Sequence, residues 1–357
     1  MQHEILRPSE FTPELAKTWN DLLDRDDDLA SPFFTLDFAS AVGRHRSDVR
    51  IAVLRSAGKV TGFLPFHHKA GGCGAPVGGP ISDYQGVIGN CADPGTSGGG
   101  LLRGCGLSCY DFNHGLMAQE LFAENAFALS RSLRADLREG FDRWEAEVKA
   151  QTKQFTKLNR MRRKIEREQG ELRFVRHDDT AQAWSTFIGW KDAALREQGA
   201  GGFPGPGWIG SVLEDIRDID TPRFAGLFST LYAGDRMVAA HFGMRSDRAW
   251  HWWFPSYDPA MQNYAPGLLL LQSCVEEAAQ LGLQELDFGR GTQRYKKEFG
   301  NRARPLCEGS LERRATAFGT SRLLRKSAQR LANRTLSEEK ASIVRRAGTK
   351  ILRAGLI

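Results

Sequence analysis

No run of eighteen apolar residues occurs in this sequence, and its first residues contain no apolar signal segment. A membrane-spanning helix needs about 20 apolar residues in a row, and an exported protein carries an apolar segment near its start. The sequence therefore predicts neither a membrane span nor export. Zinc-ligand spacing is also missing among the six cysteines, so we expect free thiols in a reducing cytoplasm and no bound metal.

The remaining composition is typical of a globular protein. Hydrophobic residues make up 41% and aromatic residues 10% of the 357 residues, enough for two domains with separate cores. The formal net charge of +6 is distributed unevenly: residues 313–357 hold twelve Lys and Arg against two Glu, a charge of +10, which leaves −4 for the remainder. In this basic tail leucines alternate with arginines, which is typical of an amphipathic helix on an anionic membrane or a partner, or of a solvated extension.

The stretch from Trp250 to Phe299 is the most informative part of the chain. Between Gly267 and Leu281 no helix-breaking residue occurs, and apolar residues cover most of the surface that a helix would have. We therefore predict a helix buried between other elements. Its first turn would present backbone N–H groups without partners inside the helix, and the helix dipole adds to their attraction for anions. An anion-binding site is thus expected at Gly267.

Directly before this helix stand Gln262, Asn263, Tyr264, Ala265, Pro266 and Gly267. These six residues resemble the Gln/Arg-x-x-Gly-x-Gly/Ala pyrophosphate loop of the GNAT superfamily of N-acetyltransferases, with Ala265 at the first glycine position. The resemblance implies that they bind the pyrophosphate of acyl-CoA, although the alanine Cβ would hold the loop farther from phosphate. Proline and glycine before a helix are also ordinary helix-start chemistry, so the flanking elements must decide.

The elements predicted around this helix support the resemblance. Their order, β-α-α-β-β-β-α-β-α, is that of a GNAT domain, and they cover about residues 171–312. In the strand at 248–254, alternation places Trp250, Trp252 and Phe254 on one face and His251 and Trp253 on the other. The remaining predicted elements are strands at 171–176, 223–231, 237–244 and 284–288, helices at 180–197, 207–216 and 292–299, and a turn at 233–236.

Part of the chain is repeated at an offset of 176 residues. Residues 106–115 (GLSCYDFNHG) recur as 282–291 (GLQELDFGRG) with five of ten positions identical, and Ala57-Gly58 recurs as Ala233-Gly234. We therefore expect two copies of one fold. In the first copy, residues 91–105 are Gly-rich and contain no long apolar helix. Only the second copy is thus expected to bind a cofactor, while the first would form one wall of an acceptor groove.

Two GNAT-like units in one chain resemble the Fem peptidyltransferases and the related CelD-like acetyltransferases of bacterial polysaccharide biosynthesis. The resemblance covers about residues 30–312 and implies an acyltransferase that uses acyl-CoA or, in the Fem branch, aminoacyl-tRNA. The residues that carry it are Ser31–Phe34, Gly62–Phe66, Lys157–Lys164, Ser256–Pro259, Tyr264–Leu270, Asp287–Gly291 and Tyr295-Lys296.

The fold class predicted from these patterns is α+β, with two tandem GNAT-like units built from mixed, mostly antiparallel sheets flanked by helices. A degenerate unit is expected at residues 1–140 and the acyltransferase unit at residues 171–312. A basic helix at residues 141–170 would join them, and residues 313–357 would form a basic helical tail. The basic residues of the joining helix could face an anionic acceptor or tRNA, or simply form a solvated face.

The GNAT resemblance also implies chemical roles. The acceptor attacks the thioester directly, so the enzyme must remove a proton from the acceptor and protonate the leaving thiolate. Tyr295 stands where the superfamily often places this acid, with Tyr264 in reserve. Asp287 and His241 are the candidate bases, since histidine titrates near neutral pH. Lys296 is a candidate ligand of CoA phosphates, and the predicted acceptor-binding residues are Trp253, Tyr257, Asp258 and Arg290.

Each of these side chains also has a structural explanation. Asp287 could cap the turn at Gly289, His241 could be a hydrogen-bonded core residue, and Asp258 could shape its loop. Three functions stay open at this stage. The first is N-acetyl transfer to an amino sugar or glycan precursor in the cytoplasm or at the inner-membrane surface. The second is Fem-type transfer from charged tRNA, and the third is a non-catalytic scaffold in polysaccharide biosynthesis.

Overall fold

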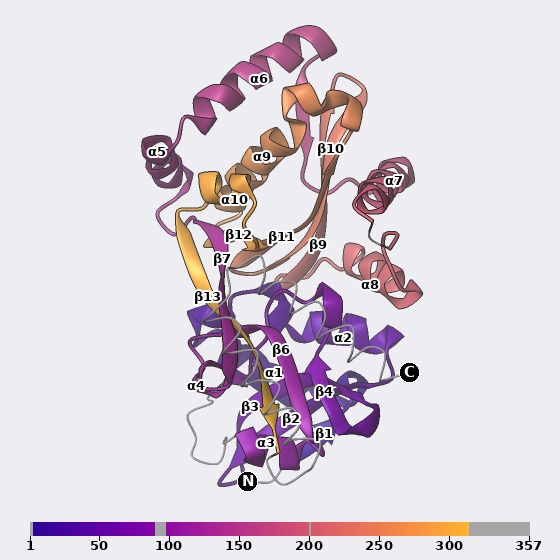
Figure 1. Cartoon of the computed structure of the whole chain (residues 1–357), viewed down its shortest axis with the longest axis vertical. Coiled ribbons are helices and arrows are strands. Elements are labelled where there is room, and N and C mark those ends of the chain that lie inside the picture. Colours follow the sequence, from indigo (N-terminus) through magenta and orange to yellow (C-terminus); the bar gives the residue numbers. More distant parts are fainter. Residues whose placement is uncertain (1–2, 90–97, 200, 314–357) are drawn as a thin grey trace. The chain divides into compact units, whose positions relative to one another are not determined.

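The computed structural model describes residues 3–89, 98–199 and 201–313 (Figure 1). These residues form two compact units. The first contains the residues up to Leu22, Asp48–Ser130 and the residues from Pro305 onward, and the second contains Leu23–Ser47 and Arg131–Arg304. Nearly all of the predicted basic tail, residues 314–357, lies outside the described residues.

The first unit is built on a mixed sheet. Its hydrogen-bonded strand order is β1-β2-β3-β4-β6-β13, in which only β4 and β6 are parallel among the described pairs, and β5 pairs with β3. Its elements are β1 (His3–Leu6), η1 (Pro8–Glu10), α1 (Pro13–Leu23), β2 (Val49–Ser56), β3 (Lys59–Lys69), η4 (Ala70–Gly72), β4 (Cys73–Pro76), η5 (Gly79–Ile81), β5 (Ile88–Gly89), α3 (Gly98–Gly104), β6 (Cys109–Leu116), α4 (Glu120–Ala123) and β13 (Arg302–Glu312).

The second unit repeats this arrangement. Its strand order is β8-β9-β10-β11-β12-β7, and among the described pairs only β11 and β12 are parallel. Its elements are η2 (Asp27–Leu29), η3 (Pro32–Phe34), α2 (Leu36–His45), β7 (Ala126–Asp136), α5 (Phe141–Gln151), α6 (Gln154–Gln169), β8 (Leu172–Val175), α7 (Ala181–Glu197), α8 (Gly207–Arg217), β9 (Phe224–Ala233), β10 (Arg236–Ser246), β11 (Ala249–Tyr257), η6 (Pro259–Tyr264), α9 (Pro266–Gln280), β12 (Glu285–Arg290) and α10 (Arg294–Phe299).

The matching strand orders of the two units confirm the predicted duplication. The turns at Ala57-Gly58 and Ala233-Gly234 each close an antiparallel hairpin, β2–β3 and β9–β10. In each unit the strand after the hairpin then runs parallel to the following sheet strand, β4 with β6 and β11 with β12. The last strand is exchanged: β7 comes from the first half of the sequence but pairs with β12, whereas β13 follows β12 in sequence and pairs with β6. The domain boundaries that we predicted at residues 140, 170 and 312 stay a prediction.

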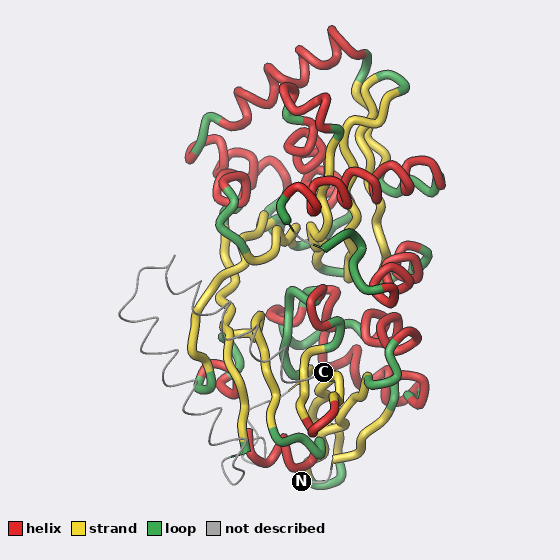
Figure 2. The backbone as a smooth tube through the Cα atoms, turned by 45° about the vertical axis from the view of Figure 1, so that its right-hand side comes forward, coloured by secondary structure: helices red, strands yellow, loops and turns green. Residues whose placement is uncertain are grey.

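Helices cover both faces of the strands in the second unit (Figures 1 and 2). On one face, α9 packs over β9 to β12, and its buried leucines share a core with Trp250 and Trp252. On the other face, α7 and α8 accompany η3 and α2, and the Phe33 ring meets the Trp253 ring at a centroid distance of 5.5 Å. The predicted burial of α9 on several sides is thus confirmed.

The prediction of a single basic helix at residues 141–170 is wrong. Two helices occupy this stretch, α5 and α6, and they are separated at Thr152 and Lys153. Thr152 adopts an extended conformation, and its hydroxyl accepts a hydrogen bond of 3.1 Å from the Gln154 N–H. A threonine side chain that binds nearby backbone in this way favours a helix end over a helix interior.

Candidate active site

Strands β11 and β12 part from each other shortly after they meet. They pair only at Ala249–His251 and Glu285–Asp287, in parallel. Beyond this point β11 continues along β10, while Arg290 of β12 pairs with Ser132 of β7. The two strands therefore diverge directly after His251 and Asp287.

A β-bulge lies at the point of divergence. Phe242 of β10 faces Phe254, but Met244 faces His251, so Trp252 and Trp253 together oppose the single residue Gly243. A bulge leaves one strand residue outside the regular ladder. Here the Trp253 N–H donates instead to Nε2 of the His241 ring, at 3.0 Å.

The bulge also corrects the predicted faces of this strand. We expected Phe254 on the same face as Trp252, but its ring packs against Phe203, at a centroid distance of 5.2 Å, and against Trp253. An extra residue in one strand shifts the alternation of side chains by one position. The sequence period alone therefore assigned Phe254 to the wrong side.

His241 is fully buried and lies flat against the Trp252 ring, with centroids 3.9 Å apart and planes 11° apart. Because Nε2 accepts the Trp253 N–H, we assign the ring hydrogen to Nδ1, which has no hydrogen-bond partner in the described part of the chain. Burial lowers the pKa of His241 well below its ordinary value, and the neighbouring His251 lowers it further. The base role of His241 stays a prediction, and it would require the bond to Trp253 to break.

The start of α9 has the conformation that the loop resemblance implies. Ala265 occupies the left-handed region, with φ 52° and ψ 46°, and ends η6 while it caps α9. Pro266 has no N–H, and the Gly267 N–H has no hydrogen-bond partner among the described residues. Gln262 and Asn263 are exposed beside it. A free amide at a helix start is the feature that an anion requires.

Because Ala265 is left-handed, Ala265→Gly is expected to keep or raise the free energy of unfolding, by up to about 1 kcal/mol. Glycine adopts this conformation without a Cβ clash, which offsets its larger entropy in the unfolded chain. Urea unfolding measures the change. The control Ala279→Gly lies inside α9 and should lose about 1 kcal/mol. A clear loss of stability in Ala265→Gly would contradict the strained conformation.

Three predicted residues around this helix start differ in their surroundings. Tyr257 is 45% exposed, and a Cβ placed on Gly267 would lie 3.5 Å from its ring. Asp258 accepts the Ala260 N–H and forms an ion pair with Arg236, at 2.6 Å, which favours the explanation that it shapes the loop; acceptor binding by Asp258 stays a prediction. The Tyr264 hydroxyl donates to Glu168 on α6, at 2.9 Å. Tyr257 is thus the aromatic side chain most open to a ligand here.

Arg290 ends β12, and the side chain of Lys296 reaches this strand end from α10. The Lys296 side chain is buried, and its Nζ donates to the carbonyl oxygens of Gly289 and Arg290, at 3.1 and 3.0 Å. The ammonium therefore holds the turn between β12 and α10. Phosphate binding by Lys296 stays a prediction.

Tyr295 lies on α10, the helix that follows β12. Its ring packs against the α9 core, and burial raises the pKa of its hydroxyl to about 12, while the nearby Trp252 indole has a smaller, opposite effect. The Trp252 indole N–H is buried and reaches hydrogen-bond geometry with no group in the described ranges. Tyr295 on α10 and Trp252 on β11 thus bring a protonated phenol and an indole N–H close to each other.

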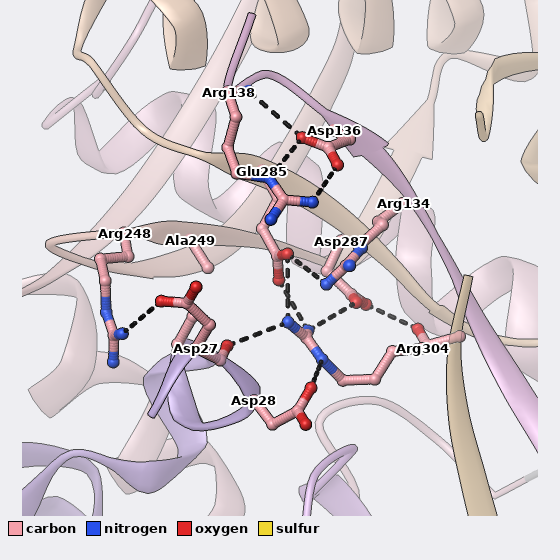
Figure 3. A network of polar contacts seen from close by, with 12 residues as sticks. Asp27, Asp28, Arg134, Asp136, Arg138, Arg248, Ala249, Glu285, Asp287 and Arg304 are labelled. Carbon is pink, nitrogen blue, oxygen red and sulfur yellow. Dashed lines mark hydrogen bonds and ion pairs between the residues drawn. The ribbon is translucent and has the colours of Figure 1, made fainter. Parts of the chain in front are cut away.

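Asp287 belongs to a buried polar network at the base of the opening (Figure 3). Its Oδ1 accepts from the Ser132 hydroxyl and from the Gly289 N–H, each at 2.7 Å, and lies 3.4 Å from Nδ1 of His251. These contacts favour the structural explanation, a carboxylate that caps the turn after β12. The role of Asp287 as a base stays a prediction.

Sequence reasoning missed the cations of this network. Arg304 places Nη1 2.7 Å from one oxygen of Glu285, and Arg134 places Nη1 2.6 Å from the other. Asp28 contacts Nε of Arg304, at 3.5 Å (Figure 3). No local pattern links these residues, because Arg134 and Glu285 are 151 positions apart.

Residues 152–297 match the family model of an acetyltransferase (GNAT) domain. All of the predicted site residues lie within this matched stretch. Among curated proteins, none matches this chain. No helix in the described ranges is long and apolar enough to cross a membrane.

Three solved structures share the fold. FemX covers 86% of this chain and 96% of its own, with 8% identity and a TM-score of 0.59. The C-terminal domain of a protein named as a lysylphosphatidylglycerol synthetase, from Agrobacterium fabrum, covers 87% and 95%, with 11% identity and a TM-score of 0.50. A protein of unknown function from Bacteroides thetaiotaomicron covers 84% and 98%, with 11% identity and a TM-score of 0.51. The predicted α+β fold class, with mixed sheets flanked by helices, is confirmed.

Proposed function

We propose that this protein is an acyl-CoA-dependent acyltransferase that transfers an acetyl group to an amine of an amino sugar or polysaccharide precursor. One observation carries the proposal: within the stretch that matches the acetyltransferase family, β11 and β12 diverge beside a helix start with a free amide. This combination offers a place for a diphosphate and a path for a thioester. The resemblance to CelD-like enzymes supplies the acceptor class.

The residues present fit acyl-CoA. The Gly267 N–H and the first turn of α9 would bind its pyrophosphate, with Tyr257 beside them. Bound acyl-CoA supplies an activated acyl group and a thiolate leaving group. Tyr295 keeps its proton at neutral pH and is the candidate group to protonate that thiolate; its raised pKa ensures the protonated form but does not make the hydroxyl a stronger acid. The buried Trp252 N–H is suited to donate to a carbonyl oxygen that gains negative charge.

Gly267→Trp tests the proposal. A Cβ at this position makes only ordinary contact with Tyr257, at 3.5 Å, so Gly267→Ala should fold and bind CoA as the native protein does. An indole group would cover the free amide, and we expect CoA binding to weaken at least tenfold, a change of about 1.4 kcal/mol. Titration calorimetry with CoA measures both variants, and circular dichroism checks their folding. Unchanged CoA affinity in a folded Gly267→Trp variant would count against the pyrophosphate site.

A Fem-type aminoacyltransferase is the second candidate, and it is favoured by one surface of α6. Lys157, Arg160 and Arg163 are exposed at helical spacing, and none forms an ion pair within the described residues. Such a face suits the phosphate backbone of tRNA. Aminoacyl transfer from charged tRNA, together with no turnover of acetyl-CoA, would reverse the order of the two proposals. The cytoplasmic location stays a prediction.

A further inference from the structure

Lys191 on α7 is a partly buried cation without a carboxylate partner. Its Nζ donates to the carbonyl oxygen of Pro255, at 3.1 Å, and lies 6.0 Å from the centroid of the Phe254 ring. Within the described ranges no Asp or Glu oxygen lies within 4.0 Å of this nitrogen. One of its three N–H donors is thus used by the protein.

An ammonium group in this position costs stability. Burial lowers the pKa of Lys191, which shows that the surroundings disfavour its charge. A buried charge is ordinarily paired, because desolvation is otherwise uncompensated. The fold gains one hydrogen bond from Lys191, and an apolar side chain of similar length would fill the same space. The missing partner is therefore to be sought outside the described chain.

Lys191 lies beside the part of β11 that has left β12. Pro255 follows the bulge at Trp252 and Trp253, and among the described strands β11 pairs only with β10 at this point. The Lys191 charge also contributes to the lowered pKa of His241, which places the ammonium within electrostatic reach of the ring stacked on Trp252. The cation is thus close to the opening on the face opposite α9.

The Phe254 ring lies beside the ammonium, and this ring packs against Phe203. The N–H of Phe203 is held by Asp192 Oδ1 at 2.8 Å. Asp192 follows Lys191 in sequence, but its carboxylate is bound to this N–H and to Arg196, at 2.7 Å. The neighbouring carboxylate is therefore committed to the loop and does not neutralise Lys191.

We propose that Lys191 binds a carboxylate group of the acceptor substrate. This inference rests on the proposed function and names the acceptor's chemical class. One positive charge and two remaining N–H donors match the charge and the two oxygens of a carboxylate, and the Phe254 ring is an apolar neighbour. A dianionic phosphate is usually bound by arginine forks or by several backbone amides. Both an amino acid and a uronic acid would satisfy the site.

Turnover of matched acceptor pairs tests the inference. The pairs are 2-amino-2-deoxyglucuronate with glucosamine, and serine with serinamide, each supplied with acetyl-CoA to the full-length protein. We expect the native enzyme to prefer the carboxylate member of at least one pair. Lys191→Met should lower that preference about tenfold to hundredfold, mainly through KM, and Lys191→Arg should retain part of it. The pair that responds identifies the source of the carboxylate.

Two further measurements separate this role from a structural one. The melting temperature of Lys191→Met should stay the same or rise, because an uncompensated charge is removed, and its CoA affinity should not change. A lower melting temperature with an unchanged preference would show that Lys191 is structural and would overturn the inference. A native enzyme that binds CoA but shows no carboxylate preference would do so as well, and leave the proposed function intact. A native protein that does not bind CoA would contradict both the proposed function and the role of Lys191.

Discussion

Tyr295→Phe is expected to lower kcat about 100- to 10,000-fold while CoA binding stays unchanged. The variant removes one hydroxyl from a ring that packs against the α9 core, so the fold should be preserved. Burial raises the pKa of this hydroxyl to about 12, and the phenol therefore carries its proton throughout the neutral range. A leaving thiolate beside Trp252 would then have a proton donor close by.

Thiol release from acetyl-CoA measures the loss, and calorimetry measures the affinity for CoA. Tyr232→Phe is the matched control, since it also removes a tyrosine hydroxyl, one that donates to Asp178 at 2.7 Å. It should lower stability by about 1 kcal/mol and leave turnover unchanged. If Tyr264→Phe lost turnover and Tyr295→Phe did not, the acid would be Tyr264. A Tyr295→Phe variant with native turnover would remove Tyr295 from the mechanism.

Arg304→Met should lower the free energy of unfolding by about 3–5 kcal/mol. The Arg304 side chain is 4% exposed and binds both oxygens of Glu285, at 2.7 and 3.2 Å. Its Nη1 also lies 4.0 Å from Asp287 (Figure 3). Removing the guanidinium leaves buried carboxylates with less compensating charge, and this cost exceeds the value of the ion pair itself.

Guanidinium unfolding of Arg304→Met and Arg302→Met measures this effect against a control two positions away. The Arg302 side chain is 49% exposed, and its ion pair with Glu147, at 3.2 Å, should contribute less than about 1 kcal/mol. Adding Glu285→Gln to Arg304→Met should recover part of the loss, because it removes a buried carboxylate that keeps only Arg134 as its cationic partner. Equal effects of the two arginine variants would show that the network in Figure 3 adds little stability.

Much of the second unit could be predicted from local patterns. The hairpin of β9 and β10, the aromatic strand β11 and the helix α9 occur within a few residues of the predicted positions. Each depends on neighbours in sequence: alternation for a strand, a glycine in a turn, and Pro266 and Gly267 before a run of leucines. The repeat at 176 residues predicted the shared sheet plan for the same reason, since similar local sequences form similar elements.

Some of the site could not be predicted, because its chemistry is decided by contacts. Lys296 was expected to face a phosphate, but it binds the carbonyl oxygens of Gly289 and Arg290. Lys191 was not singled out at all. Its spacing from Trp184 and Phe187 places a lysine on the apolar face of α7, and this is the signal that sequence reasoning could have used.

The sequence by itself determined which elements form, where the GNAT resemblance lies and where a helix starts behind Ala265. Only the tertiary structure decided that β7 and β13 exchange places, that β11 bulges at Trp252 and Trp253, and that Arg304 binds Glu285. The physical reason is the range of the interactions. Turns and periodicity arise between residues a few positions apart, whereas strand pairing and burial of charge join residues far apart in the chain.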